Sequence, residues 1–232
     1  MKSQLNLINK VLFAFICLLI VSCNEDEIGN NAIVKDIDGN IYHTVKIGTQ
    51  TWMVENLKTT KFRDGSSIPN VTDNNDWTNH GDMNMGAYCD YNNMVSYSNT
   101  YGRLYNWHAV TDERNICPPG WHVPSSAEWE TLISFLGGKT EAGGAMKEKG
   151  TTHCSGPNIG GTNSSGFTAL PGGCRQINSG MYFGNGTACT WWSSTEINAQ
   201  TAWYCQLYFD QTSINRMAFD KSSGCSIRLI KD

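Results

Sequence analysis

The stretch Cys117–Gly138 reads CPPGWHVPSSAEWETLISFLGG and carries the clearest helix signal in the chain. Ser125 and Glu128 form the S-x-x-E pattern of a capping box, which begins a helix by satisfying free backbone N–H groups. Four apolar residues then follow at i, i+3, i+4 and i+7, namely Trp129, Leu132, Ile133 and Leu136. This spacing places one apolar stripe on the helix, and the glycine pair 137–138 ends it. We therefore expect a main helix over about residues 125–136.

The sequence on both sides of this helix predicts short strands separated by turns. Strands are expected where β-branched and aromatic residues stand between clusters of Gly, Pro, Asn and Asp. The expected strand segments are 33–57, 167–170, 190–195, 202–209, 214–219 and 225–230. A second short helix is expected over about residues 141–149, and residues 71–85 are expected to form a polar loop around Trp77. The fold class that follows is α+β, with short strands in antiparallel sheets packed on the main helix.

The first residues have the order of a secretory signal. Lys2 and Lys10 precede an apolar run, Val11–Val21, which is too short to span a bilayer. The segment Leu19–Cys23, LIVSC, resembles a bacterial lipobox, and this resemblance implies cleavage before Cys23 and lipidation of its thiol. Acyl chains on Cys23 would anchor the protein in a membrane, because each buried CH₂ contributes about 0.8 kcal/mol. A plain secretory signal without lipidation is the alternative.

An acidic run, Asn24–Glu27, follows the expected lipidation site. Such a run is typical of a solvated linker, and it also resembles the surface-export signal of Bacteroidota lipoproteins. The expected layout is a signal peptide over residues 1–22, an acidic lipid-anchored tether over residues 23–33 and one folded domain over residues 34–232. The expected location is the outer membrane, with the domain exposed at the cell surface.

Composition and motifs exclude several function classes. The chain has 17 Lys and Arg against 21 Asp and Glu, and no basic run, so no nucleic-acid partner is expected. No P-loop, G-x-S-x-G or H-E-x-x-H pattern occurs, and we expect neither a cofactor nor a metal ion. Calcium-dependent sugar binding would need an acidic residue before Pro157-Asn158, where Gly156 stands. The sequence names no catalytic residue.

Seven cysteines follow Cys23, an odd number, so at least one is unpaired within the chain. They are Cys89, Cys117, Cys154, Cys174, Cys189, Cys205 and Cys225. One pairing follows if Trp192 lies opposite Ala202 in the expected sheet. Cys189 and Cys205 then lie directly across from each other, with Cβ atoms about 4.5–5.5 Å apart. A small local adjustment would allow a disulfide, which export would favour.

Aromatic side chains are the strongest candidates for ligand contact. Trp191 and Trp192 stand next to each other in an expected strand, so their side chains point to opposite faces. One ring is expected in the core, and the other is either covered by a loop or exposed as a stacking platform for a sugar or a protein partner. Four further rings in polar segments are candidates to line the same side: Trp77, Tyr88, Tyr91 and Tyr97.

Many segments of this chain stand in the order typical of one known family. They include IGTQTWMVENLKTTKF (47–62), GAYCDYNN (86–93), YGRLYNWHAV (101–110), WWSSTE (191–196) and SIRLIKD (226–232). From about residue 34 to the end, the chain resembles the Fibrobacter succinogenes major paralogous domain. That domain is similar to the C-type-lectin-like group, which includes the formylglycine-generating-enzyme type and its pattern G-W-x-[LV]-P-[ST]-x-x-E-W, found here at Gly120–Trp129. The resemblance implies a C-type-lectin-like single domain and carries no assigned activity.

The same resemblance suggests further cysteine pairs. Cys174 and Cys225 stand where the family usually has aromatic residues, which suggests that two packing partners became a disulfide pair. Cys89 and Cys117 match family cysteines and suggest a third bridge, which leaves Cys154 single.

Three function classes remain open from sequence. The first is a non-catalytic binding or adhesion module at the cell surface, with a glycan or a protein as its ligand. The second is an envelope enzyme related to the formylglycine-generating group, which needs a reactive cysteine pair near the C-terminus. Only Cys205 and Cys225 stand in that region, twenty residues apart. The third is a structural surface protein, and the oligomeric state is open in all three.

Overall fold

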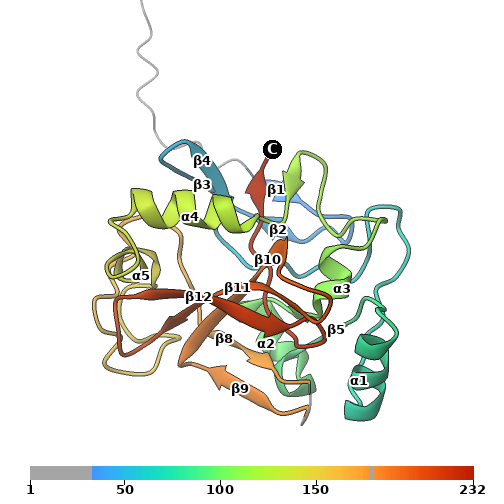
Figure 1. The fold of residues 1–232 in the computed structure, drawn as a ribbon. Helices are drawn as coiled ribbons and strands as arrows, with labels where there is room; N and C mark the ends of the chain where they lie inside the picture. Colours follow the sequence, from blue (N-terminus) through green and yellow to red (C-terminus); the bar gives the residue numbers. More distant parts are fainter. Residues whose placement is uncertain (1–32, 178–179) are drawn as a thin grey trace, which may run out of the picture. The chain divides into compact units, whose positions relative to one another are not determined.

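The structure is a computed structural model that describes residues 33–177 and 180–232. The expected signal segment, the lipidation site Cys23 and the acidic run 24–27 lie outside the described residues. In the described ranges, no helix is both long enough and apolar enough to cross a bilayer. The predicted α+β class is confirmed, because several short antiparallel sheets stand beside a few helices (Figure 1).

The main helix is α4 (Ser126–Phe135), and it begins and ends as the sequence predicts. The Ser125 side chain accepts a hydrogen bond from the Glu128 N–H, and Glu128 Oε2 accepts one from the Ser125 N–H at 2.7 Å. Trp129, Leu132 and Ile133 are its buried apolar residues. The Gly138 N–H donates to the Ile133 carbonyl at 2.9 Å with glycine in the left-handed region, so the predicted capping box and glycine stop are confirmed.

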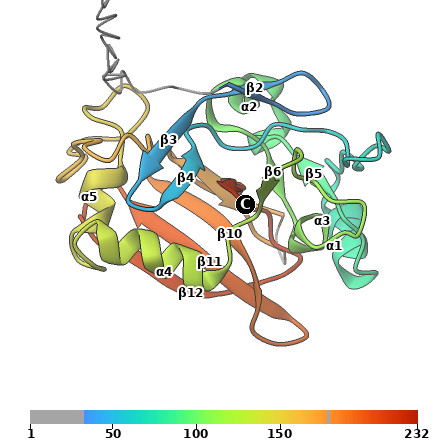
Figure 2. The ribbon, with the colours of Figure 1, turned by 90° about the horizontal axis from the view of Figure 1, so that it is seen from above.

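A three-stranded antiparallel sheet packs against α4. Its strands, in spatial order, are β10 (Ala188–Glu196), β11 (Thr201–Tyr208) and β12 (Ile214–Asp220). These strands match three of the expected segments closely. The helix α4 contacts both β10 and β11 (Figure 2). Trp191 from β10, Trp129 from α4 and Trp52 meet in this interface, where all three rings are fully buried.

A second sheet joins the two ends of the described domain. Its spatial order is β3 (Thr44–Ile47), β4 (Gln50–Met53), β13 (Ile230–Lys231) and β7 (Trp121–His122). The last strand is therefore inserted between β4 and β7, and Ile230 pairs with both Trp52 and His122. The expected strand 225–230 is wrong in extent, since only its last residue belongs to β13.

Three two-stranded sheets complete the strands. They pair β1 (Val34–Lys35) with β2 (Ile41–Tyr42), β5 (Tyr88–Cys89) with β6 (Leu104–Tyr105), and β8 (Gly172–Arg175) with β9 (Tyr182–Asn185). The expected strand 167–170 forms only an isolated bridge between Ala169 and Lys147. Short helical segments lie between the sheets: η1 (Tyr91–Asn93), α2 (Val95–Tyr101) and α3 (Trp107–Val110).

The second predicted helix exists but is shorter than expected, since α5 covers only Ala142–Met146. The next residue, Lys147, leaves the helical conformation with φ −65° and ψ 142°. Its buried ammonium group donates hydrogen bonds to the carbonyls of Ile159 at 2.7 Å and Gln211 at 2.8 Å. A buried ammonium group must be hydrogen-bonded. The helix therefore ends before Lys147, where the chain direction lets the side chain reach these distant carbonyl acceptors.

The expected polar loop 71–85 is wrong, because it contains a helix, α1 (Asn74–Asp82). Asp73 caps this helix by accepting hydrogen bonds from the next backbone N–H groups. Its one large apolar residue, Trp77, is fully buried, and the Arg175 guanidinium lies 4.4 Å from the Trp77 ring. Tertiary contacts at a single side chain therefore stabilise a helix whose sequence is too polar to show an apolar stripe.

Candidate functional site

Most of the predicted ligand-binding rings lie in the interior. Trp77, Trp191 and Trp192 have no exposed surface, and Tyr88 is 7% exposed. Each indole N–H is satisfied inside: the acceptors are the Ser222 carbonyl, the Asn56 Oδ1 and the Tyr105 carbonyl respectively. The two adjacent tryptophans do point to opposite faces, but both faces are covered. Of the two alternatives for the second tryptophan, the structure shows the covered one, and neither ring is an exposed stacking platform.

The other two predicted rings belong to a row of aromatic side chains near the surface. We call the row the aromatic strip, and its members in spatial order are Tyr182, Tyr91, Tyr97, Tyr101 and His153. Successive ring centroids lie 5.2, 5.4, 6.1 and 6.0 Å apart. Tyr91 is 9% exposed, and the other four are partly exposed. Such separations are typical of interacting aromatic pairs.

Three elements of the fold position the strip. The η1 segment contacts β8 and β9, and α2 follows it directly (Figure 1). Asn92 and Asn93 adopt the left-handed region, with φ of 52° and 57°, which asparagine tolerates. The Asn93 side chain accepts a hydrogen bond from the Tyr182 hydroxyl at 2.6 Å and donates one to the Thr72 carbonyl at 3.2 Å. Asn93 therefore attaches the β9 ring to the η1 turn.

Apolar and polar groups border the strip. Met94, which stands three residues before Tyr97 at the start of α2, is 51% exposed. At the far end, His153 Nδ1 lies 2.9 Å from a Glu148 carboxylate oxygen. The surface thus combines apolar ring faces with hydroxyl, amide and carboxylate groups at its edges.

Burial raises the pKa of Tyr91, Tyr101 and Tyr182 above the usual range of a phenol. These hydroxyls therefore stay protonated at neutral pH and can donate hydrogen bonds as well as accept them.

Sequence analysis missed three members of the strip: Tyr101, Tyr182 and His153. Tyr97 and Tyr101 stand four residues apart, a spacing that places two side chains on one face of a helix. The four-residue spacing of Tyr97 and Tyr101 indicates a shared face only in a helix, and the sequence analysis did not predict the helix α2. Tyr182 and His153 come from distant segments and have no local signal.

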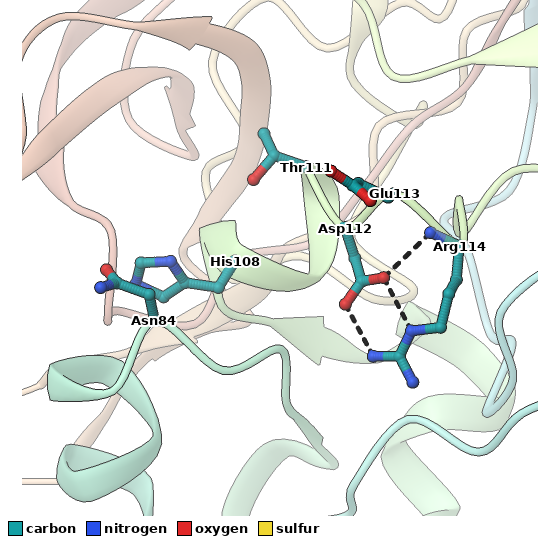
Figure 3. Close-up of a pocket in the computed structure, with 6 residues that line it drawn as sticks. All are labelled: Asn84, His108, Thr111, Asp112, Glu113 and Arg114. Atoms are coloured by element: carbon teal, nitrogen blue, oxygen red, sulfur yellow. Dashed lines mark hydrogen bonds and ion pairs between the residues drawn. The ribbon is translucent and has the colours of Figure 1, made fainter.

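A separate hollow of about 540 Å³ lies at the C-terminal end of α3. Figure 3 shows its lining residues, which are Asn84, His108, Thr111, Asp112, Glu113 and Arg114. Asp112 and Arg114 are paired to each other by hydrogen bonds of 2.8 and 2.7 Å. Partial burial, followed by the charge of Lys221, lowers the pKa of His108, so this ring is neutral at pH 7.

A second hollow of about 370 Å³ shares Asn84 and His108 with the first. Its other walls come from the end of α1, from residues 220–222 and from Ile177, Ala199 and Gln200. Within the described residues, His108 has no hydrogen bond to a hydroxyl or a carboxylate, which nucleophilic catalysis would require. No group of three or more His, Cys, Asp or Glu side chains in the described ranges has the arrangement of a metal site.

His122 connects the start of α4 to the end of the chain. Its Nε2 lies 2.8 Å from Glu128 Oε1, and its Nδ1 lies 2.7 Å from Asp232 Oδ1. Partial burial favours the neutral imidazole, but the hydrogen bonds to Asp232 and Glu128 outweigh it and raise the pKa of His122. Burial also acts against the charged form of Glu128, while hydrogen bonds from Ser125 and His122 lower the pKa of that carboxyl.

This network predicts a pH-dependent contribution to stability. The His122 contribution is present below pH ~6.5 and is lost as the pH rises through the raised folded pKa. The Glu128 contribution is present above pH ~4.5 and is lost as the pH falls through the lowered folded pKa. His122→Gln should therefore lower the melting temperature most between about pH 4.5 and 6.5. Solvent screening of the 37% exposed ring limits the effect to about 1 kcal/mol or less.

Thermal unfolding of the parent and His122→Gln at pH 4 to 9 checks this prediction. A difference in melting temperature that stays constant across this range, or that grows toward pH 9, would show that the charged imidazole contributes nothing.

The described cysteines, from Cys89 to Cys225, are all free and buried in the structure. The predicted register is wrong: Trp192 lies opposite Tyr204, and Cys189 lies opposite Leu207. The cause is the position of the turn: Glu196, not Trp192, pairs with Ala202, so the hairpin turns later in the chain than expected. The irregularity between Trp192 and Glu196 recovers only part of this offset. Cys189 and Cys205 are therefore not directly opposed.

The two cysteine pairs suggested by the resemblance have different surroundings. Cys89 and Cys117 belong to different buried clusters, so the structure does not bring them together in one core. Cys174 and Cys225 belong to the same cluster.

The fold and its surface define an α+β domain in which the last strand, β13, lies between β4 and β7 and in which one flank carries a row of aromatic rings. The chain belongs to the Fibrobacter succinogenes major domain family, whose model matches residues 45–231. The resemblance predicted from sequence is thereby confirmed. No curated protein and no solved structure matches the chain, so the C-type-lectin-like grouping stays a prediction.

Proposed function

We propose that this protein is a surface-anchored, non-catalytic binding module, and that the aromatic strip is its glycan-binding face. The observation that carries the proposal is the row of rings from Tyr182 to His153, in which Tyr91 is buried and the other four rings are partly exposed. Sugar rings present C–H faces with hydroxyl groups at their edges. Tyrosine offers the matching combination of an apolar ring and a polar tip.

Charge and geometry favour a neutral glycan over an acidic one. Three charged groups lie at the strip: Glu148 and His153 are paired with each other, and the Arg175 guanidinium, 5.3 Å from the Tyr182 ring, is fully buried. Polar groups also border the tyrosines: the Tyr182 hydroxyl donates to Asn93 Oδ1, and the Asn185 backbone N–H donates to the Tyr91 hydroxyl. The exposed Met94, three residues before Tyr97, adds an apolar side chain beside the rings.

Glycan-array binding by purified residues 24–232 tests the proposal. The parent should bind a subset of glycans, and Tyr97→Ala and Tyr182→Ala should each weaken binding about tenfold, since a stacking contact contributes on the order of 1–1.5 kcal/mol. Trp203→Ala is a matched control, because Trp203 is a partly exposed ring on β11 outside the strip. Its binding should equal that of the parent.

Two array results would contradict the proposal. Equal losses in Trp203→Ala and in the strip variants would show that binding does not depend on the strip. If the parent binds no glycan on the array, the glycan proposal is wrong, and a protein ligand or a structural role for the domain remains.

The enzyme alternative needs an accessible thiolate, and the surroundings of its cysteines argue against it. Cys205 and Cys225 are 1% and 0% exposed. Burial raises the pKa of both thiols well above the usual range, so the reactive thiolate form is disfavoured.

The membrane anchor is part of the proposed function and has its own test. Cys23→Ala should abolish labelling by radioactive palmitate and release the protein from the membrane fraction, because the acyl chains supply the anchoring free energy. Cys154→Ala is the control, since that cysteine is buried in the folded domain. Unchanged labelling and unchanged membrane retention in Cys23→Ala would show that Cys23 is not lipidated, and the first residues would then act as a plain secretory signal.

A further inference from the structure

The strand β8 meets the segment before the C-terminus at one antiparallel bridge. The Arg175 N–H donates to the Gly224 carbonyl at 2.9 Å, and the Gly224 N–H donates to the Arg175 carbonyl at 2.8 Å. The approach is close, because a Cβ built on Gly224 would lie 3.2 Å from Arg175 Cβ. These two hydrogen bonds form one closely spaced pair of an antiparallel ladder, and they hold the two segments side by side.

The next pair along these segments is Cys174 and Cys225. Their backbone groups point away from each other: Cys225 exchanges both hydrogen bonds with Tyr105, and Cys174 pairs with Phe183. This pattern defines a non-hydrogen-bonded antiparallel pair, in which Cα atoms lie about 4.5 Å apart. Disulfides accept Cα separations of about 4.4–6.8 Å.

The side chains share one environment. Consecutive residues alternate between the faces of a strand, so Cys174 and Cys225 lie on the face opposite to Arg175 and Gly224. Both belong to one buried cluster that also contains Trp107, and they are 4% and 0% exposed. Beyond them the segments remain close, since a Cβ on Gly172 would lie 3.4 Å from Ser226 Oγ.

We propose that Cys174 and Cys225 form an intramolecular disulfide that fastens the β8–β9 hairpin to the C-terminal segment. The two thiols lose two protons and two electrons to a disulfide oxidant, which becomes two thiols. One cysteine thiolate attacks the oxidant to form a mixed disulfide, and the second cysteine displaces the reduced half of the oxidant. Because both thiols are buried in the final fold, the exchange takes place during folding.

The bond would act on the surface that carries Tyr182. The hairpin β8–β9 holds Tyr182 at one end of the aromatic strip, and β8 is the strand that the disulfide anchors (Figure 1). Closing the long loop between residues 174 and 225 restricts the unfolded chain and stabilises the folded one.

Mass mapping of the refolded chain tests the proposal. The purified protein is reduced and denatured, and then refolded in a buffer of oxidised and reduced glutathione. It is next alkylated in denaturant without reduction, so that buried free thiols also react, and digested. The expected product is a peptide pair joined between Cys174 and Cys225 that separates on reduction. In Cys174→Ser, Cys225 should become alkylated, and in Cys225→Ser, Cys174 should become alkylated. Cys154→Ser, which changes a cysteine outside this cluster, should keep the joined pair.

Two results would overturn the proposal: alkylation of both Cys174 and Cys225 when the refolded parent is alkylated in denaturant, or a linkage of either one to a different cysteine. Neither depends on glycan binding, so failure here leaves the proposed function untouched. Conversely, a flat glycan array leaves the disulfide assignment intact.

Discussion

Replacing Trp129 by Ala is expected to lower the free energy of unfolding by about 3–5 kcal/mol. The ring has no exposed surface, and its centroid lies 4.9 Å from that of Trp52 and 5.8 Å from that of Trp191. Its indole nitrogen has no hydrogen-bond partner among the described residues, so the change removes packing alone. A loss of this size is a large fraction of the 5–15 kcal/mol that stabilises a typical domain.

Denaturant unfolding of Trp129→Ala and of Phe135→Ala measures this effect. Phe135 stands on the same helix but is 63% exposed, so its replacement should change stability by less than about 0.5 kcal/mol. Equal midpoints for the Trp129 variant and the parent would show that the cavity is tolerated and that α4 is not the centre of the core.

Replacing Arg228 by Ala is expected to cost about 3–5 kcal/mol, because the guanidinium is the donor for several buried oxygens. Arg228 is 1% exposed, and its Nε donates to Asn56 Oδ1 at 2.9 Å. Its Nη1 donates to the carbonyls of Met53 at 3.2 Å and Phe167 at 2.6 Å. Burial lowers the pKa of Arg228 to about 9, which still leaves it charged at neutral pH.

Arg114→Ala is the matched control for this prediction. The Arg114 side chain is 44% exposed and pairs with Asp112 at the surface, so its loss should cost about 1 kcal/mol or less. Unfolding free energies for both variants, measured in the same denaturant, decide the comparison. A similar small cost for both would mean that the oxygens around Arg228 find other donors.

The sequence was sufficient for the elements whose signals are local. The capping box at Ser125 and Glu128, the apolar spacing after it and the glycine stop predict α4 because each acts within one or two helical turns. The strands β10, β11 and β12 were predictable because each is a run of strand-forming residues between turn residues. The candidate site was predicted only in part: of six rings proposed from sequence, Tyr91 and Tyr97 belong to the strip.

Tertiary structure decided everything that depends on which distant groups meet. The helix α1 forms because Trp77 is buried against Arg175, a contact between segments about a hundred residues apart. The register of β10 against β11 depends on where the chain turns: Glu196 pairs with Ala202, so Cys189 lies opposite Leu207 and not Cys205. Trp191 and Trp192 are covered because carbonyl and amide oxygens from elsewhere in the chain accept their N–H groups. Local sequence propensity does not encode such partners, because the burial and the neighbours of a side chain depend on packing across the whole chain.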